Sequence, residues 1–212
     1  GSRLTWLVNK LLKRIILSRS WQVTLRHREV KVRPLKVRDA KKWKEIRLRN
    51  QNWMQEWEAT APVPSIEPAP TFRQSARRLI KDSAAGRSMA FVVEYQNEFV
   101  GQLNVGDIVY GSLRGAHLGY WIDHRFAGRQ IMTTAVALVT EHLLTTSGLH
   151  RIEIAVRPEN LPSNKLVQRL GFRFEGIRKK FLHINNDWRD HNIYVMFSED
   201  LTGSLLTRLN RS

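Results

Sequence analysis

The sequence predicts one α/β domain of the α+β kind, in which helices flank a mixed central sheet. The apolar runs 118–122 and 151–156 are typical of buried strands, and the segment between them has helical periodicity. This strand–helix–strand unit predicts a right-handed crossover between two parallel strands. Hairpin patterns at 96–98 and 185–186 add antiparallel strands. With 212 residues, of which 42% are apolar, the chain can bury one full core.

Residues 1–20 are expected to form a basic amphipathic helix ahead of the domain. Apolar side chains recur at i, i+3, i+4 spacing between Leu4 and Ile16, while Lys10 and Lys13 occupy the other face. Two interpretations stay open. The helix could bind ribosomal RNA or an anionic membrane surface, or it could dock on its own domain or on a second copy of the chain in a homodimer.

The net charge of +16 is unevenly distributed. Residues 1–50 hold 16 Lys and Arg against 3 Asp and Glu, a net charge of +13, and the remaining residues carry only +3. A positive field of this kind attracts phosphate backbones and anionic lipids. The basic character therefore belongs to the N-terminal region.

Several classes of function are disfavoured by what the sequence lacks. There is no cysteine, which excludes disulfides and thiol nucleophiles. No apolar run could span a bilayer and no cleavable signal is evident, so a cytoplasmic protein is expected. The seven histidines show no metal-ligand spacing, so no metal is expected. Neither a P-loop nor a G-x-S-x-G elbow occurs, which disfavours nucleotide hydrolysis and serine hydrolysis.

The folded domain is expected to span residues 21–201, with residues 202–212 as a loosely held C-terminal tail. Asp39 is expected to cap a helix that runs through Arg49, and Thr71 to cap another. The other predicted elements are short strands at 23–25 and 30–32, a Pro-rich loop at 61–70, strands at 89–95 and 99–108, a short helix closed by Gly171, and a last hairpin from 172 to 196.

The basic loop Arg125–Gln130 is the strongest candidate for a binding site. It connects the strand at 118–122 to a helix, so free backbone N–H groups and the positive end of the helix dipole meet there. Gly128 allows a ligand to approach the backbone closely, and Arg125 and Arg129 add charged donors. This arrangement suits a pyrophosphate.

Three motifs in order, R-F-A-G-R-Q (125–130), R-P-E-N-x-x-S (157–163) and R-L-G-F-x-x-E-G (169–176), resemble the GNAT acetyltransferase superfamily. The segments 175–179 and 187–191 are similar to the ribosomal-protein-alanine N-acetyltransferases of RimJ/RimL type, RimJ above all. The resemblance covers roughly residues 30 to 201. It implies a GNAT fold whose parallel strand pair is splayed, acetyl-CoA as the donor, and the N-terminal α-amine of a protein as the acceptor, a ribosomal protein being favoured.

The resemblance also implies the residues of the site. Those expected to bind acetyl-CoA are Trp121, Ile122, Arg125, Phe126, Ala127, Gly128, Arg129, Gln130, Ile131, Met132, Thr133, Asn160 and Ser163. Those expected to contact the acceptor are Trp53, Trp57, Trp188, Arg189 and Asp190. The two tryptophans, four residues apart, could instead be helix packing, and the hairpin residues could form an ordinary cross-strand ion pair.

The sequence departs from the superfamily pattern at two positions. Gln130 replaces the final Gly or Ala of the phosphate loop, at a cost of about 1 kcal/mol if the site requires a positive φ. Val167 stands where many members carry a tyrosine, so no acid is available at that position. Ser163 is the candidate donor to the departing thiolate, although it could be only the N-cap of its helix.

The implied reaction is direct attack of an amine on the thioester, with the oxyanion bound by a backbone N–H of the strand near Gly119. The general base is open, because Leu182 occupies the position of the hairpin glutamate used by RimL-type enzymes. His117 or a water relay to a backbone carbonyl could serve instead. Two other functions remain: acetylation of lysine or a small-molecule amine, and a non-catalytic acyl-CoA-binding or RNA-binding module.

Overall fold

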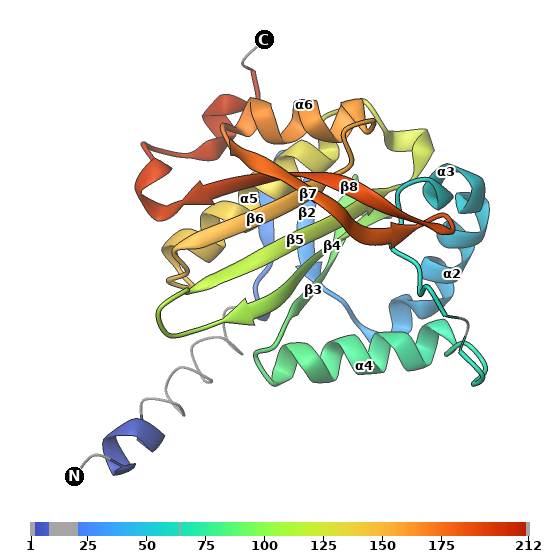
Figure 1. Cartoon of the computed structure of the whole chain (residues 1–212), viewed down its shortest axis with the longest axis horizontal. Coiled ribbons are helices and arrows are strands. Elements are labelled where there is room, and N and C mark those ends of the chain that lie inside the picture. The colour runs from blue at the N-terminus through green and yellow to red at the C-terminus, as the bar shows by residue number, and fades with distance from the viewer. Residues whose placement is uncertain (1–2, 9–20, 64, 211–212) are drawn as a thin grey trace.

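The computed structural model describes residues 3–8, 21–63 and 65–210, which build one eight-stranded sheet with helices on both faces (Figure 1). The strand order is β1-β2-β3-β4-β5-β6-β8-β7. The strands are β1 (Leu25–His27), β2 (Val30–Pro34), β3 (Met89–Tyr95), β4 (Glu98–Val109), β5 (Gly115–Ile122), β6 (Arg151–Val156), β7 (Arg173–Ile184) and β8 (Asp187–Phe197). The helices are α2 (Ala40–Arg49), α3 (Gln51–Gln55), α4 (Phe72–Ala84), α5 (Ile131–Thr145) and α6 (Leu161–Leu170), with 3-10 turns η1 (Val37–Asp39), η2 (His124–Phe126), η3 (Ser198–Asp200) and η4 (Leu205–Arg208).

The pair β5–β6 is parallel and every other neighbouring pair in the sheet is antiparallel. β5 and β6 pair with each other only where Gly115–His117 lie beside Arg151–Glu153. Beyond that point they separate, while β5 stays paired with β4 and β6 with β8. The predicted mixed sheet with a splayed parallel pair is therefore confirmed. The splay opens the middle of the sheet, and an opening there exposes backbone groups that neighbouring strands would otherwise satisfy.

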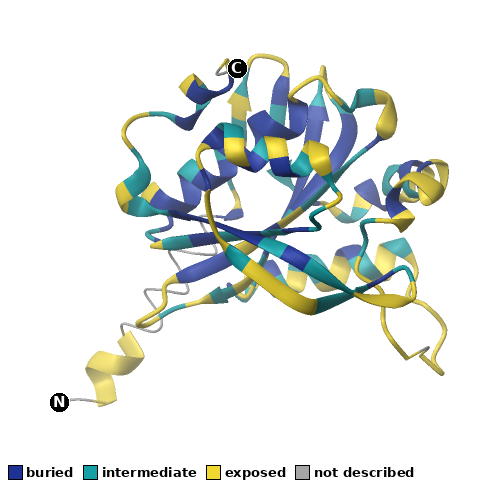
Figure 2. Cartoon of the chain, turned by 45° about the horizontal axis from the view of Figure 1, so that its top comes forward, coloured by how far each residue is buried: buried dark blue, intermediate teal, exposed yellow. Residues whose placement is uncertain are grey.

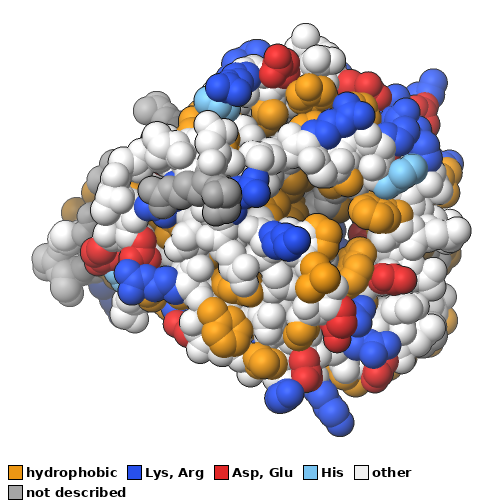
Figure 3. Space-filling view, turned by 90° about the horizontal axis from the view of Figure 1, so that it is seen from above, with side chains coloured by type: hydrophobic (Ala, Val, Ile, Leu, Met, Phe, Trp, Pro, Cys, Tyr) orange, Lys and Arg blue, Asp and Glu red, His pale blue; other side chains and the backbone are white. Residues whose placement is uncertain are grey.

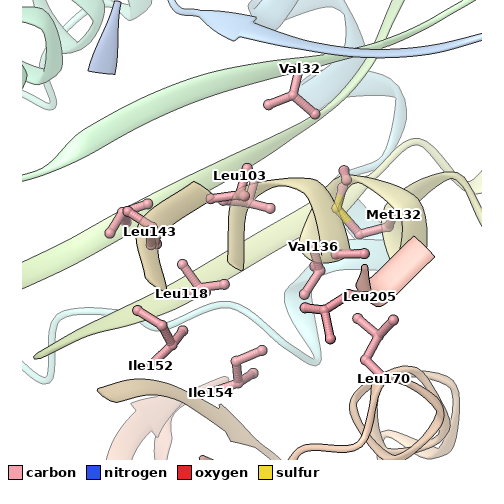
Figure 4. Close-up of a cluster of buried hydrophobic side chains, with 14 of the residues drawn as sticks. Val32, Leu103, Leu118, Met132, Val136, Leu143, Ile152, Ile154, Leu170 and Leu205 are labelled. Carbon is pink, nitrogen blue, oxygen red and sulfur yellow. The ribbon is translucent and has the colours of Figure 1, made fainter. Parts of the chain in front are cut away.

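The two faces of the sheet carry different helices. α5 is buried along almost its whole length and packs with alternate sheet residues into the main core, part of which is shown in Figure 4. On β3, Phe91 and Val93 face this core, while Ala90 and Val92 face a second cluster with α2 and α4. Figure 2 shows the buried residues concentrated in the central strands and in α5.

Residues 202–210 do not form a loose tail, so that prediction was wrong for this part of the segment. Leu205 is 0% exposed and lies in the main core beside Leu170 (Figure 4). The carboxylate of Glu141 on α5 accepts hydrogen bonds from Ser204 Oγ (3.0 Å) and Leu205 N (2.9 Å). The buried side chains of Leu205 and Leu209 and these hydrogen bonds fix the C-terminal segment to α5 and α6.

Other local predictions had mixed outcomes: one cap was wrong and one turn is confirmed. Asp39 sits at the start of α2 but caps nothing there, because its carboxylate binds the Arg33 guanidinium and the Lys36 N–H. The turn between β3 and β4 is as predicted, with Gln96 and Asn97 both at positive φ. Residues 3–8 are helical and exposed, but most of the predicted N-terminal helix lies outside the described residues. Among the described helices, none is long and apolar enough to span a bilayer.

Candidate active site

The divergence of β5 from β6 opens into a cavity of about 1410 Å³ that extends to both faces of the sheet. On one face it is lined by the first turn of α5 and by α6, and on the other by α3 and the β7–β8 hairpin. Figure 3 shows a hollow with hydrophobic side chains inside it and Lys or Arg side chains around it. The cavity can therefore hold two reactants that enter from opposite faces and meet at the splay.

The first turn of α5 is an uncapped helix N-terminus that faces this cavity. Gln130 adopts the left-handed conformation (φ 57°), so the strain expected for a positive φ applies here, and its side chain makes no cap hydrogen bond. Gly128 has φ 77°, and a Cβ there would meet open space. Residues Gly128, Gln130, Ile131, Met132 and Thr133 all line the cavity. Free N–H groups at a helix N-terminus suit an anion such as a pyrophosphate.

Arg125 and Arg129 do not line the cavity. Their guanidinium groups both lie 5.4 Å from the Phe126 ring, and Arg125 also donates to Asp123 (2.9 and 3.1 Å). Burial alone would raise the pKa of Asp123, but hydrogen bonds from Arg125 and Arg49 hold that pKa well below its usual value. Asp123 is thus a permanent anion that shapes the loop.

Two cations on α6 line the cavity in addition to the loop, and the sequence reasoning missed both. Lys165 and Arg169 are one turn apart on the side of α6 that faces the α5 N-terminus. With its amide oriented to satisfy both atoms, Gln130 accepts from Arg169 Nη1 (2.5 Å) and donates to Leu209 O (3.0 Å). Lys165 and Arg169 are four residues apart and so share one side of α6, but they follow Ser163 by two and six residues, so helical spacing from Ser163 would not have found them.

Ser163 is not the cap of α6, so that alternative was wrong. Asn160 is the N-cap, and its side-chain oxygen accepts a hydrogen bond from Ser163 N (3.2 Å). The Ser163 hydroxyl is left for another partner, which is the hydroxyl of Tyr120 at 2.6 Å. Both side chains line the cavity.

Tyr120 is a site residue that the sequence reasoning missed. It follows Leu118 by two positions on β5, so both point to the face that α5 and α6 cover. Burial raises the pKa of Tyr120 to about 12, although the bond to Ser163 opposes the rise. Its hydroxyl therefore keeps its proton at neutral pH. The alternation of strand residues was the signal that could have found it.

On the opposite face, Trp53 and Trp57 line the cavity as predicted. They do not share a helix, because α3 ends at Gln55, and neither is part of the buried core. The Arg157 guanidinium lies 5.3 Å from the Trp57 ring and donates to Glu56 O (2.6 Å). These contacts fix the position of Trp57 at the wall of the cavity.

The three hairpin residues predicted for the acceptor do not line the cavity. Trp188 packs against His183 and is 49% exposed, and Arg189 lies near Asp187 (3.4 Å). Asp190 accepts from Lys179 Nζ (2.9 Å) and Lys180 N (2.8 Å), across the hairpin. Leu182, Phe181 and His191 line the cavity instead.

His191 is the buried titratable group on the acceptor side of the cavity. Its Nδ1 lies 3.0 Å from Arg189 O, and a carbonyl can only accept, so Nδ1 carries the proton. Burial lowers the pKa of His191 below its usual value, with help from the charge of Arg157. No described residue hydrogen-bonds to Nε2. The side chain is therefore a neutral imidazole whose Nε2 lone pair is free.

His117 also lines the cavity, at the last paired position of β5, opposite Glu153. Its Nδ1 lies 3.3 Å from the exposed carboxylate of Asp107. Glu153 accepts hydrogen bonds from Arg151 and Arg178, so it has no free oxygen to act as a base. Nowhere in the described ranges do three or more His, Asp or Glu side chains form a group that could bind a metal.

Comparisons with known proteins agree with this geometry. The family model described as an acetyltransferase (GNAT) domain matches residues 29–173. The probable N-acetyltransferase YjcK of Bacillus subtilis (strain 168) is 29% identical over 179 residues, which cover 83% of this chain and 98% of the relative. The ribosomal protein uS5-alanine N-acetyltransferase of Escherichia coli (strain K12) is 34% identical over 107 residues, 50% of this chain and 55% of the relative. Mycobacterium smegmatis RimJ in complex with CoA-disulfide has a TM-score of 0.81 and 35% identity, and the match covers 90% of this chain and 94% of that one.

Proposed function

Because this chain belongs to the GNAT acetyltransferase family, we propose that it transfers the acetyl group of acetyl-CoA to the N-terminal α-amine of a ribosomal protein. The observation that carries the proposal is the cavity that opens on both faces of the sheet, with the Tyr120–Ser163 pair beside the splay. Relatives named for acetylation of ribosomal proteins support the choice of acceptor.

The residues present fit acetyl-CoA. The uncapped first turn of α5 would hold the pyrophosphate through backbone N–H groups, and Lys165 and Arg169 would add charge from α6. Backbone groups of β5 beyond His117 are unpaired with β6 and could bind the thioester oxygen. When bound, acetyl-CoA supplies an acetyl group activated as a thioester.

Tyr120 and Ser163 stabilise the departing sulfur as hydrogen-bond donors. Either hydroxyl of this pair can be the donor, and the proposal assigns that role to Tyr120, so that the Ser163 proton is free to point at the sulfur. A thiol has a pKa near 8.5, about 3.5 pKa units below that of Tyr120, so net proton transfer from Tyr120 would cost about 5 kcal/mol. The pair therefore donates a hydrogen bond to the thiolate without giving up its proton.

His191 is the proposed acceptor of the proton that the amine loses. Its Nδ1–H is fixed by Arg189 O, its Nε2 is free, and its lowered pKa keeps it neutral near pH 7. An α-amine has a pKa of about 8 against about 10.4 for lysine, so lysine is handicapped by about 3 kcal/mol. A weak neutral base therefore suffices for a terminal amine and serves lysine poorly.

The acceptor wall suits an extended, positively charged N-terminus. Trp53 and Trp57 offer aromatic faces, and the Glu56 side chain also lines the cavity and forms no ion pair with any described residue. A cationic amine is drawn toward such a wall before it loses its proton to the base.

The test is acetylation of matched peptides followed by tandem mass spectrometry. One set has a free N-terminal Ala or Ser and internal lysines, and the other set is blocked at the N-terminus. We expect the α-amine of the first set to be modified and the lysines of both sets to be spared at pH 7. Preferential lysine modification, or activity only on small amines, would move the protein to another acceptor class. Absence of any acetyl-CoA turnover would indicate a non-catalytic binding module.

A further inference from the structure

The positive charge of the folded domain is concentrated in two segments that form one layer. Residues 36–49 and 71–87 together hold 12 Lys and Arg against 3 Asp and Glu, a net charge of +9. They contain η1, α2 and α4, which contact one another on the face of the sheet opposite α5 (Figure 1). The charge of this layer is therefore a property of the fold, in addition to the charge of residues 1–20.

Eight exposed side chains in this layer form no ion pair with any residue that the structure describes. We call them the cationic layer: Lys36, Arg38, Lys41, Lys44, Arg73, Arg77, Arg78 and Lys81. The two exposed or half-buried acids among them, Glu45 and Asp82, are already engaged by Lys42 and Arg87. No acidic side chain in the described part of the chain neutralises these eight positive charges.

The positive charges of α4 lower the stability of the helix itself in two ways. No acidic residue lies in its first turn, where the helix dipole favours one, and Arg73 stands there instead. Arg73, Arg77 and Lys81 follow one another at i, i+4 spacing, at which like charges destabilise a helix. A face selected only for solubility would alternate Lys or Arg with Glu. The row of like charges indicates selection for an anionic partner.

We propose that the cationic layer binds the phosphate backbone of RNA, beside the acceptor side of the cavity. The proposal rests on the proposed function, because ribosomal proteins are held on RNA and the enzyme would meet its acceptor there. Residues four apart on α4 lie about 6 Å apart along the helix, so the row can contact successive phosphates. α2 leads directly into α3, which carries Trp53 at the cavity wall, so RNA on this layer lies next to the acceptor entrance.

An anionic membrane fits this surface less well. Membrane-surface helices insert a face of large apolar side chains between the lipid headgroups. No large apolar side chain of η1 or α4 is exposed, and on α2 only Leu48 is. The apolar side of α4, with Ala76 and Leu79, is packed on the sheet. The layer offers charge without an insertable face, which is the pattern of phosphate-backbone binding.

The test is the salt dependence of binding to a fluorescently labelled single-stranded RNA, measured by anisotropy with the full chain. The double variant Arg77→Gln/Lys81→Gln removes two charges from the cationic layer. The matched control Arg26→Gln/Arg28→Gln removes two exposed charges from the β1–β2 hairpin. The first variant should reduce the slope of log K against log salt by about 1.4 and weaken binding on the order of tenfold at 0.1 M salt, while the control should leave both unchanged.

Three outcomes would overturn the proposal: equal losses in the two variants, no loss in the first, or loss of binding to anionic phosphatidylserine vesicles with RNA binding intact. Acetylation of a free peptide is measured in parallel. It should be the same in both variants and the unmodified chain, because none of the four residues lines the cavity. Loss of RNA binding with normal peptide turnover supports the cationic layer. Absence of peptide turnover in the unmodified chain would reject the proposed function while leaving RNA binding measurable.

Discussion

The two halves of the cavity are built by different means. The cofactor half uses the backbone of one continuous stretch, from β5 through the loop to the first turn of α5, with α6 beside it. The acceptor half is assembled from side chains of α3, β5 and the β7–β8 hairpin, which are far apart in the sequence. A site made of backbone groups depends on the path of the chain. A site made of side chains depends on the strand register, because the register decides which side chains face the cavity.

Because of this difference, substitutions in the two halves should impair binding in different ways. In the cofactor half, a new side chain harms binding mainly by adding charge or bulk where the backbone receives a ligand. In the acceptor half, removal of one side chain removes the contact itself. The following predictions test that contrast, from the largest expected effect to the smallest.

Gly128→Glu should abolish CoA binding, a loss on the order of 100-fold or more, because a carboxylate would face the anion site at the α5 N-terminus. The matched variant Gly128→Ala adds only strain at φ 77° and should cost about 1 kcal/mol of stability. Isothermal titration with CoA measures the affinities, and circular dichroism checks the fold. A folded glutamate variant with unchanged affinity would reject the pyrophosphate assignment.

Ser163→Ala and Tyr120→Phe should each lower kcat about 10- to 100-fold with little change in the KM for acetyl-CoA, because Ser163 donates to the charged sulfur and Tyr120 orients the Ser163 hydroxyl. The double variant should be no slower than the slower single variant, since the two hydroxyls act as one chain. Steady-state kinetics on all three variants decide the matter. Losses that multiply would mean that the hydroxyls act independently.

His191→Gln should lower kcat about tenfold near pH 7, a modest loss because an α-amine is already partly neutral there. Since the pKa of His191 is lowered, the neutral base is present above that pKa and is lost as the pH falls through it. The unmodified enzyme should therefore show a fall in kcat on the acid side, below about pH 6.5, that the variant lacks.

The matched control is His117→Ala, which should keep the acid-side fall. If instead the fall disappears in His117→Ala and survives in His191→Gln, His117 is the base and the assignment of His191 is wrong.

Trp57→Ala should raise the KM for the acceptor peptide about fivefold and leave the KM for acetyl-CoA unchanged, because its ring lies only on the acceptor wall. Trp188→Ala should change neither constant, since Trp188 lies outside the cavity and packs against His183. Equal effects of the two substitutions would show that the acceptor site extends beyond the cavity.

The same contrast explains what the sequence could predict. Most of the strands, the parallel pairing of β5 with β6 and the connection into α5 follow from local patterns, and the structure confirms these elements. Helix periodicity and turn chemistry act over a few residues, so one stretch of sequence contains all that they need.

The acceptor half could not be predicted in the same way. The pairing of β7 with β8 is interrupted between Arg178 and Leu182, and such an irregularity changes which side chains of the hairpin face the cavity. His191 lines the cavity while Asp190 does not, because neighbouring residues of β8 point to opposite faces of the sheet. Tyr120 was missed because its role depends on a hydroxyl of α6, 43 residues further along the chain.

The burial of residues 202–210 has a consequence for truncated forms of the protein. Leu205 belongs to the core, and Arg208 Nη1 donates to Leu170 O (2.7 Å) at the end of α6. A chain cut after Leu201 would lose these contacts and leave a cavity in the core, so it should unfold more readily than the intact chain. Proteolysis at this point would therefore destabilise α5 and α6, the two helices beside the proposed cofactor side of the cavity.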